Sequence, residues 1–162
     1  MHYSIAFILQ IRYHKKHHLS FHIMKITKKG TQKNIFTVRR ARPGAGLGLF
    51  ATADIPKHTF VIEYTGEKIT NAEADRRGGR YLFNINSKWT IDGKEHRNTA
   101  RYINHSCDPN CESRIVGGKV KIFAIKNITA GEELAYDYGT EYFEEFLKPH
   151  GCRCDMCHIL RK

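Results

Sequence analysis

The residues best equipped for chemistry stand together in one stretch, Asn104-His105-Ser106-Cys107-Asp108-Pro109-Asn110-Cys111. Asn, Ser, Asp and Pro favour turns, because short polar side chains compete for backbone hydrogen bonds and Pro stops a helix. The stretch nevertheless carries two thiols and an imidazole, and apolar-rich segments flank it. Polar loops of this composition often contribute to binding or catalytic sites. We therefore expect residues 104–111 to form part of a site.

A second concentration of reactive side chains lies near the C-terminus, in Cys152-Arg153-Cys154-Asp155-Met156-Cys157. Three thiols within six residues suit tetrahedral Zn²⁺, whose Zn–S bonds are about 2.3 Å long. Three ligands leave one position for a residue from elsewhere. The alternatives are free thiols in a mobile tail, or disulfides, although a disulfide framework is typical of small secreted chains and five cysteines is an odd number. A reducing compartment with a metal is the better interpretation.

Glycines are concentrated in Gly44-Ala45-Gly46-Leu47-Gly48. A dinucleotide-binding loop would need a helix to open at these glycines, so that its N-terminus meets a phosphate. Pro56 follows too soon for a helix of useful length, and a strand-like run comes directly after it. Two interpretations remain, a flexible turn or a backbone that approaches a ligand closely.

Several aromatic residues also have chemical potential if the fold brings them together. Each of them alone is more often a core residue, because Tyr buries well whenever its hydroxyl finds a partner. The local sequence does not show whether they meet. They are Tyr64, Tyr81, Phe83, Tyr102, Tyr136 and Tyr138.

Length and charge bound the class of protein. A chain of 162 residues is one domain by length, and no stretch reaches the ~20 apolar residues of a membrane span. We expect no signal peptide, because no basic residue precedes the apolar run at 5–9 and no cleavage site follows it. Residues 1–42 hold ten Lys or Arg and no Asp or Glu, which predicts a basic arm, either a polyanion binder or a solvated tail.

The elements that must position these residues are mostly short strands. β-Branched and aromatic runs predict strands at 35–38, 60–64, 81–85 and 90–93. Residues 113–116 and 119–124, joined by Gly117-Gly118, predict a hairpin. Only 71–77, with Asn71 as its cap, and 141–147, ending before Pro149, have helical patterns. The expected fold class is mainly β.

Taken together, these motifs resemble the signature of SET-domain protein lysine methyltransferases with a post-SET zinc-binding segment. The resemblance covers residues 34–157 and rests on separate motifs in the family's order, which also include Glu63-Tyr64-Thr65-Gly66-Glu67, Tyr81-Leu82-Phe83 and Tyr136-Asp137-Tyr138. It implies a SET domain of several short curved sheets, with knot-like C-terminal threading, few short helices and a zinc-binding tail. The implied domains are a basic arm at 1–33, the SET domain at 34–140 and the post-SET segment at 141–162.

The resemblance also implies a reaction and its residues. The reaction is S-adenosylmethionine-dependent N-methylation of a protein lysine, with Tyr138 as the catalytic tyrosine. Tyr136 resembles the family's phenylalanine/tyrosine switch and implies mono- or dimethylation. The resemblance implies that Tyr64 and Tyr136 assist Tyr138 in catalysis, and that Phe83 and Tyr136 line the lysine channel. The residues that it places around the cofactor are Gly46, Leu47, Gly48, Tyr81, Asn104 and His105.

The same resemblance implies that Cys107 joins Cys152, Cys154 and Cys157 in holding Zn²⁺, which leaves Cys111 as a spare thiol. Two features depart from many family members. The tail has C-x-C-x2-C spacing, as in the MYND-SET group, and Ile159 and Leu160 stand where an aromatic often closes over the cofactor.

Two other functions explain part of the sequence. A catalytically weak SET-like module could bind a protein or chromatin through the basic arm, and a zinc-stabilised nucleic-acid binder would leave the glycine and tyrosine motifs unused. The expected partners of the enzyme are a lysine-bearing protein such as a histone, and nucleic acid through the arm, with no membrane. The expected location is intracellular: the nucleus in a eukaryote, or the cytoplasm or an infected host cell for a bacterial protein.

Overall fold

The computed structural model describes residues 35–159. All described residues belong to one compact unit. The predicted basic arm at 1–33 lies outside the described residues.

The described residues form ten short strands and only short helices, so the predicted mainly β fold is confirmed. The strands are β1 (Phe36–Arg40), β2 (Leu47–Ala51), β3 (Phe60–Tyr64), β4 (Glu67–Thr70), β5 (Leu82–Asn84), β6 (Trp89–Asp92), β7 (Asn104–His105), β8 (Cys111–Val116), β9 (Lys119–Ala124) and β10 (Ala135–Tyr136). The helices are α1 (Asn71–Arg77), α2 (Thr140–Tyr142) and α3 (Asp155–Ile159), with 3₁₀ turns at Thr99–Tyr102 and Lys148–His150 and a π-helical segment at Phe143–Leu147.

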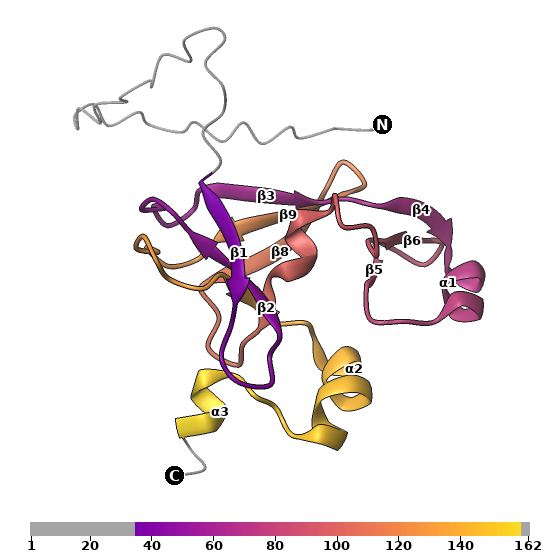
Figure 1. The fold of residues 1–162 in the computed structure, drawn as a ribbon. Helices are drawn as coiled ribbons and strands as arrows, with labels where there is room; N and C mark the ends of the chain where they lie inside the picture. The colour runs from indigo at the N-terminus through magenta and orange to yellow at the C-terminus, as the bar shows by residue number, and fades with distance from the viewer. Residues whose placement is uncertain (1–34, 160–162) are drawn as a thin grey trace, which may run out of the picture. The chain divides into compact units, whose positions relative to one another are not determined.

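The strands pair into four small sheets. Three are antiparallel, with the orders β1-β2, β3-β9-β8 and β4-β6-β5, and the fourth is the parallel pair of β7 and β10. Figure 1 shows α1 beside the β4-β6-β5 sheet, while the loop between β1 and β2 extends toward α2 and α3. The glycine loop and the cysteine-bearing tail, distant in sequence, therefore lie near each other.

Local patterns explain the best predicted elements. Residues along β9 alternate, so that Val120, Ile122 and Ala124 are buried while the residues between them are more exposed. Gly117 and Gly118, with φ of 60° and 72°, make the tight turn from β8 into β9. The hairpin was predicted at these positions, and β3 has its predicted boundaries.

The first helix occupies its predicted residues, but its cap differs from the prediction. The Thr70 hydroxyl, not Asn71, accepts the hydrogen bond from the Glu73 backbone N–H, at 3.2 Å. Asn71 is the first helical residue, and its side chain instead accepts from the Thr90 hydroxyl and donates to the Asn86 carbonyl. Tertiary partners thus decided which of two adjacent capping residues was used.

The predicted C-terminal helix is longer and less regular than expected. Helical turns run from α2 through the π-helical segment, and a 3₁₀ turn continues past Pro149 to residue 150. Pro149 does not end the run, because it stands in the first turn of the 3₁₀ segment, where no N–H is needed. α3 was not predicted.

One apolar core joins the sheets. It includes side chains with at most 1% exposure on β2, on β9 and in the segments beside β7 and β10, namely Leu49, Ile103, Val120, Ile122, Ile128 and Leu134. Among the described residues, no helix is both long and apolar enough to span a bilayer.

Candidate active site and candidate metal centre

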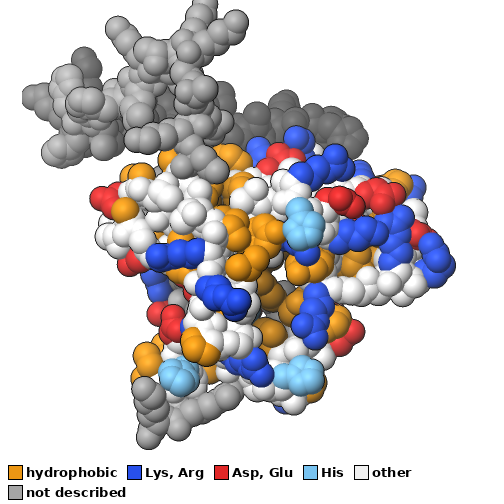
Figure 2. All heavy atoms as spheres, in the orientation of Figure 1, with side chains coloured by type: hydrophobic (Ala, Val, Ile, Leu, Met, Phe, Trp, Pro, Cys, Tyr) orange, Lys and Arg blue, Asp and Glu red, His pale blue; other side chains and the backbone are white. Residues whose placement is uncertain are grey.

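A cleft of about 1660 Å³ lies between the strand region and the C-terminal helical segments. Its wall includes the glycine loop, the end of β3, part of α1, β5, the segment leading into β7, the segment after β10, and the tail around 150–154. Figure 2 shows the hollow, with hydrophobic side chains at its base and Lys or Arg side chains at its rim.

The predicted catalytic and channel aromatics form a continuous chain of rings in this cleft. Tyr64 and Phe83 have ring centroids 5.5 Å apart, and Phe83 and Tyr136 are 6.4 Å apart. Tyr136 and Tyr138 follow at 4.9 Å. The structure thus brings together the four residues Tyr64, Phe83, Tyr136 and Tyr138, which come from β3, β5, β10 and the segment after β10.

Two of these tyrosines have their hydroxyl protons engaged by the backbone. Tyr138 donates to the Ile103 carbonyl at 2.7 Å, and Tyr64 donates to the Tyr81 carbonyl at 2.9 Å. A phenol has one donor and two acceptor lone pairs. The oxygens of both residues can therefore only accept further hydrogen bonds.

Burial keeps these phenols neutral. Loss of solvent raises the pKa of Tyr136 and of Tyr138 well above the ordinary value, and neighbouring tyrosines add to the effect. Burial also raises the pKa of Tyr64, although the nearby Arg101 opposes it. A neutral phenol at physiological pH does not act as a general base, so their chemistry is that of orientation and hydrogen bonding.

The parallel pairing of β7 with β10 holds the predicted cofactor pair beside the tyrosines. His105 lies opposite Tyr136 in register, and its Nδ1 accepts a hydrogen bond from the Tyr138 backbone N–H at 3.3 Å. This bond places the ring proton on Nε2, which lies 3.3 Å from Cys107 Sγ. Burial lowers the pKa of His105, against an opposing effect of Asp137. His105 is thus a neutral, oriented imidazole.

The glycine stretch is a turn followed by a strand, and it contributes to the cleft in part. Gly44 and Gly46 have φ of 80° and 77°, in the left-handed region that favours glycine, and Gly46 and Leu47 line the cleft. Gly48 is buried and lies against Glu133, where a Cβ would come within 2.5 Å of Oε1. Gly48 is therefore the one predicted cofactor residue that does not line the cleft.

Tyr81 lies at the rim. Its side chain is 38% exposed, and the Arg101 guanidinium lies over its ring, 4.0 Å from the centroid. Tyr102, whose hydroxyl lies 2.8 Å from His96 Nδ1, lines the cleft as well.

The sequence reasoning missed aromatic residues on the C-terminal helical run. Tyr142 packs edge-on against Tyr138, with centroids 4.8 Å apart, and Phe146 packs against Tyr142 at 4.7 Å. Phe143 lies 5.7 Å from the His105 ring. Tyr138, Tyr142 and Phe146 are each four residues apart, and this spacing places side chains on one face of a helix. It was the sequence signal that could have identified Tyr142 and Phe146.

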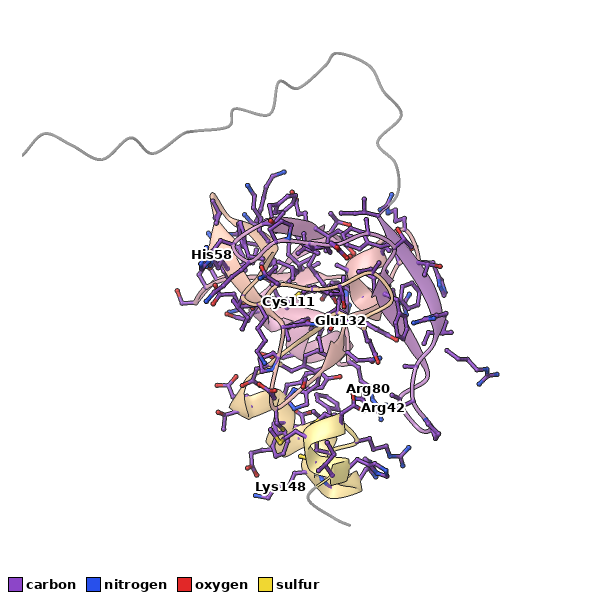
Figure 3. All side chains as sticks on the ribbon, turned by 90° about the vertical axis from the view of Figure 1, so that its left-hand side faces the viewer. Arg42, His58, Arg80, Cys111, Glu132 and Lys148 are labelled. Carbon is purple, nitrogen blue, oxygen red and sulfur yellow. The ribbon has the colours of Figure 1, made fainter. Side chains whose placement is uncertain are left out.

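A polar network behind the glycine loop was also missed. Arg42 donates to the Arg153 carbonyl, and its Nη1 lies 3.4 Å from Glu133 Oε2. Glu133 Oε1 in turn accepts a hydrogen bond from Asn104 Nδ2 at 2.6 Å. Figure 3 shows Arg42 at the junction between the strands and the C-terminal helices. Glu133 opens the motif that carries Tyr136 and Tyr138, but no role was predicted for it, and no local pattern marks Arg42, which is one charge among many.

The four predicted metal ligands converge. The sulfur atoms of Cys107, Cys152, Cys154 and Cys157 lie within 4.8 Å of one another. Cys107 Sγ is 3.9 Å from Cys152 Sγ and 3.6 Å from Cys157 Sγ. A tetrahedral Zn²⁺ site with Zn–S bonds of about 2.3 Å has S–S edges of roughly 3.8 Å. The spacing and the donor type therefore fit Zn²⁺.

The lowered pKa of the Cys154 thiol favours metal binding. Burial alone would raise its pKa, but hydrogen bonds from the backbone N–H groups of Cys107 and Cys157, together with the neighbouring thiols, lower it to about 7. The metal-binding form of a cysteine is the thiolate. Cys111, the predicted spare, is a fully buried residue of β8 and is not part of the cluster.

Comparisons with known proteins agree with this geometry. The family model described as "SET domain" matches residues 46–139. Human "Histone-lysine N-methyltransferase 2D" is 43% identical over 121 residues, which are 67% of this chain and 2% of the relative. "Histone-lysine N-methyltransferase trithorax" of Drosophila virilis is 39% identical over 143 residues, or 81% of this chain and 4% of the relative. "Histone-lysine N-methyltransferase, H3 lysine-4 specific" of Schizosaccharomyces pombe is 45% identical over 105 residues, or 57% and 11%.

Solved structures agree as well. A chain in the Chaetomium thermophilum polycomb repressive complex 2 aligns with a TM-score of 0.60 at 38% identity, covering 65% of this chain and 15% of that chain. The chain spans no more than 11% of the length of the three curated relatives named above. The family match covers more than half of the chain, and the sheets, cleft and cysteine cluster accompany it. The chain therefore belongs to the SET-domain family.

Proposed function

We propose that the protein is an S-adenosylmethionine-dependent histone-lysine N-methyltransferase. The observation that carries this proposal is the convergence of three chain-distant features on one cleft: the rings of Tyr64, Phe83, Tyr136 and Tyr138, the pair Asn104 and His105, and the turn at 44–47. The names of the curated relatives support a histone substrate.

The aromatic rings would prepare the substrate lysine. A lysine ammonium has an unperturbed pKa of about 10.4 and no lone pair for attack. Enclosure between Tyr136, Phe83 and Tyr64 would remove water from the amine, and this desolvation lowers its pKa. Most of the acceleration then comes from alignment of the amine with the methyl group. No nucleophilic side chain or covalent intermediate is required.

The tyrosine hydroxyls would supply that alignment. Since Tyr138 and Tyr64 donate their protons to backbone carbonyls, their oxygens are left as acceptors. An acceptor there can take an N–H of the lysine amine or a weak C–H···O contact from a polarised methyl group. Tyr138 is accordingly the proposed catalytic tyrosine, with Tyr64 and Tyr136 assisting it.

Tyr136 would limit the number of methyl groups added. Its ring is buried between Phe83 and Tyr138, and its neutral hydroxyl can hydrogen-bond the amine or an ordered water. The hydroxyl leaves less room for a methylated amine to turn. We therefore propose mono- or dimethylation as the product.

The cofactor would be held by the parts of the cleft that offer backbone and small polar groups. The proposed cofactor contacts are Gly46, Leu47, Asn104, His105 and Tyr81. Gly48 would not contact the cofactor, but its lack of a side chain leaves space for the Glu133 carboxylate. When bound, S-adenosylmethionine supplies an electrophilic methyl group on a sulfonium.

The tail would be organised by Zn²⁺ held by Cys107, Cys152, Cys154 and Cys157. A closed site of four thiolates is structural, because no position is left for substrate. It would fix the tail at 150–154 against the loop that begins at Asn104, and so complete one wall of the cleft. The proposed organisation is a basic arm at 1–33, a SET domain at 34–140 and a post-SET segment at 141–162.

The remaining partners follow from this function. A histone methyltransferase would work in the nucleus, where the basic arm at 1–33 would have nucleic acid as its polyanion. We propose that the arm adds salt-sensitive affinity for nucleosomal DNA rather than sequence specificity.

The test is methyl transfer from radiolabelled S-adenosylmethionine to core histones, followed by mapping of the modified lysines by mass spectrometry. We expect labelled histone with the wild type, and a loss of about a hundredfold or more in Tyr138→Phe, because one positioned hydroxyl is removed from the reaction. Tyr138→Phe should still bind S-adenosylhomocysteine. A wild type that binds the cofactor product but labels no protein would instead support a SET-like binding module.

A further inference from the structure

We propose that Glu133 is a positioning residue that sets the orientation of the Asn104 side-chain amide, so that Asn104 reads a hydrogen-bond donor of the bound cofactor. This inference rests on the proposed function, since it concerns how the same cleft recognises its ligand. It adds a residue that does not itself line the cleft.

The hydrogen bonds of Asn104 carry the first step. Its Nδ2 donates to the Leu47 carbonyl at 3.1 Å and to Glu133 Oε1 at 2.6 Å. A side-chain amide has two N–H donors, and both are used by these acceptors. Asn104 lines the cleft, so the group that it has left for a ligand is Oδ1, an acceptor.

The reason for this orientation is the carboxylate. An ionised Glu133 only accepts hydrogen bonds, so it selects the NH₂ face of Asn104 and excludes the flipped amide, which would set two oxygens against each other. The Leu47 carbonyl makes the same choice at the second N–H. Two acceptors therefore fix one of the two amide orientations.

Glu133 is itself held firmly. Its backbone bridges to Phe50, and its carbonyl accepts from Asn110 Nδ2 at 2.8 Å. Its side chain is only 16% exposed, and Arg42 Nη1 lies 3.4 Å from the other carboxylate oxygen. Gly48 leaves the room that this side chain occupies, because a Cβ would come within 2.5 Å of Oε1.

Arg42 supports the arrangement from the cysteine-bearing tail. Its guanidinium donates to the Arg153 carbonyl and to the His105 carbonyl, the latter at 3.4 Å. The cation thus holds the Glu133 carboxylate beside the loop that carries Asn104. The network orients Asn104 from outside the cleft.

Asn104 Oδ1 can accept from an N–H or an O–H group, and the partner proposed for it is a nitrogen donor of the cofactor rather than a ribose hydroxyl. S-adenosylmethionine has two such groups, the α-ammonium of its amino-acid end and the exocyclic amine of its adenine. Either group would satisfy Oδ1, and loss of the matching donor would leave Oδ1 without its partner in the complex.

The experiment compares three probes by calorimetry: S-adenosylhomocysteine, its analogue with hydrogen in place of the α-ammonium, and S-inosylhomocysteine, which lacks the exocyclic amine. We expect the wild type to bind one analogue about tenfold or more weakly than the parent compound. The analogue that is discriminated identifies the donor that Asn104 reads.

The informative variant is Glu133→Gln, because glutamine keeps the volume but can present an NH₂ group. In this variant the Leu47 carbonyl is the one acceptor that still selects the original amide orientation, so the flipped amide, with its NH₂ group toward the ligand, becomes more accessible. We expect the dissociation constant of the discriminated analogue, divided by that of S-adenosylhomocysteine, to fall severalfold toward one. Glu112→Gln, a matched change on the far-from-cleft strand β8, should leave the ratio unchanged.

Each outcome is decisive. If Glu133 had only a structural role, Glu133→Gln would bind all three probes more weakly by the same factor, and the ratio would keep its wild-type value. That result would overturn the inference while the proposed function stands. A wild-type ratio near one for both analogues would overturn it too. Failure of the wild type to bind S-adenosylhomocysteine would instead remove the proposed function. Thermal unfolding of each variant confirms that it is folded.

Discussion

The guanidinium of Arg77 on α1 lies 2.9 Å from the carboxylate of Asp92 at the end of β6, a side chain only 5% exposed. Arg77 also contacts Glu67 on β4 and Glu73 one turn earlier in α1, each at 2.6 Å. One cation therefore ties α1 to the two adjacent strands of the β4-β6-β5 sheet. Because β5 contributes Phe83 to the cleft, this anchor supports the sheet that carries one wall of the proposed lysine channel.

The Arg77–Asp92 contact predicts a pH-dependent contribution to stability. Burial by itself raises the pKa of Asp92, but hydrogen bonds from Arg77 and from the Lys94 backbone outweigh it and lower this pKa below 3.8. A carboxyl whose pKa is lowered by folding stabilises the native state above its unfolded pKa, and this contribution is lost as the pH falls through the folded value. We expect the difference in unfolding free energy between wild type and Asp92→Asn to be full above about pH 5 and to shrink below about pH 4.

Urea unfolding at a series of pH values measures that difference. Loss of metal in acid affects both proteins and cancels in the comparison. A difference that stays constant from pH 7 to pH 3 would contradict the assignment of this contribution to Asp92.

Replacement of Tyr136 by Phe is expected to move the product toward trimethyl-lysine. The change removes the hydroxyl that would occupy space beside the substrate amine, while the ring contacts with Phe83 and Tyr138 remain. Mass spectrometry of a methylated histone peptide at equal turnover should show a severalfold rise in the trimethylated fraction. Tyr102→Phe is the matched control, because the Tyr102 hydroxyl lies 2.8 Å from His96 Nδ1 and its ring takes no part in the ring contacts of Tyr136. Abundant trimethyl product from the wild type would refute the proposed limit.

Metal analysis is expected to find about one zinc ion per chain, since one cluster of four thiols is present among the described residues. Cys157→Ser should lose most of it, whereas Cys111→Ala should keep it. Removal of the metal with a chelator should lower the melting temperature and weaken binding of S-adenosylhomocysteine, because the tail at 150–154 forms part of the cleft wall. Full affinity for S-adenosylhomocysteine in the metal-free protein would show that the cysteine cluster does not support the cleft.

The Cys111 thiol is expected to resist alkylation in the native protein. Burial raises its pKa to about 12, so at pH 8 only about one thiol in ten thousand is ionised, and the side chain is fully enclosed. After metal removal, iodoacetamide should modify the four clustered cysteines and spare Cys111 until denaturant is added. Peptide mass spectrometry resolves the sites. Rapid modification of Cys111 in the folded protein would show that β8 opens readily.

Local sequence was sufficient for elements whose pattern is self-contained. The alternation along β9, the Gly117-Gly118 turn and the β-branched run of β3 each reflect the chain's own preference, and these elements formed where they were predicted. The same holds for α1, although Thr70 rather than Asn71 caps it, because the choice depended on Thr90 and Asn86 across the sheet.

Recognition of the site from sequence depended on motifs rather than on periodicity. The family resemblance of the motifs at 104–107, 136–138 and 152–157 implied a tyrosine-lined channel and a four-cysteine zinc site, and the structure brings the tyrosines and the four thiols together. The two-residue strands β7 and β10 are too short for any periodic signal, and neither the strands nor their pairing was predicted.

The chain by itself therefore determined which side chains can do chemistry and which short strands carry them. Only the tertiary structure decided that Glu133 faces Asn104, that Gly48 makes room for a carboxylate rather than for a ligand, and that Tyr142 completes the wall around Tyr138. The physical reason is that hydrogen bonds and ring contacts between residues tens of positions apart depend on distances of a few ångströms. Those distances are set by packing of the whole core and leave no pattern in the neighbouring sequence.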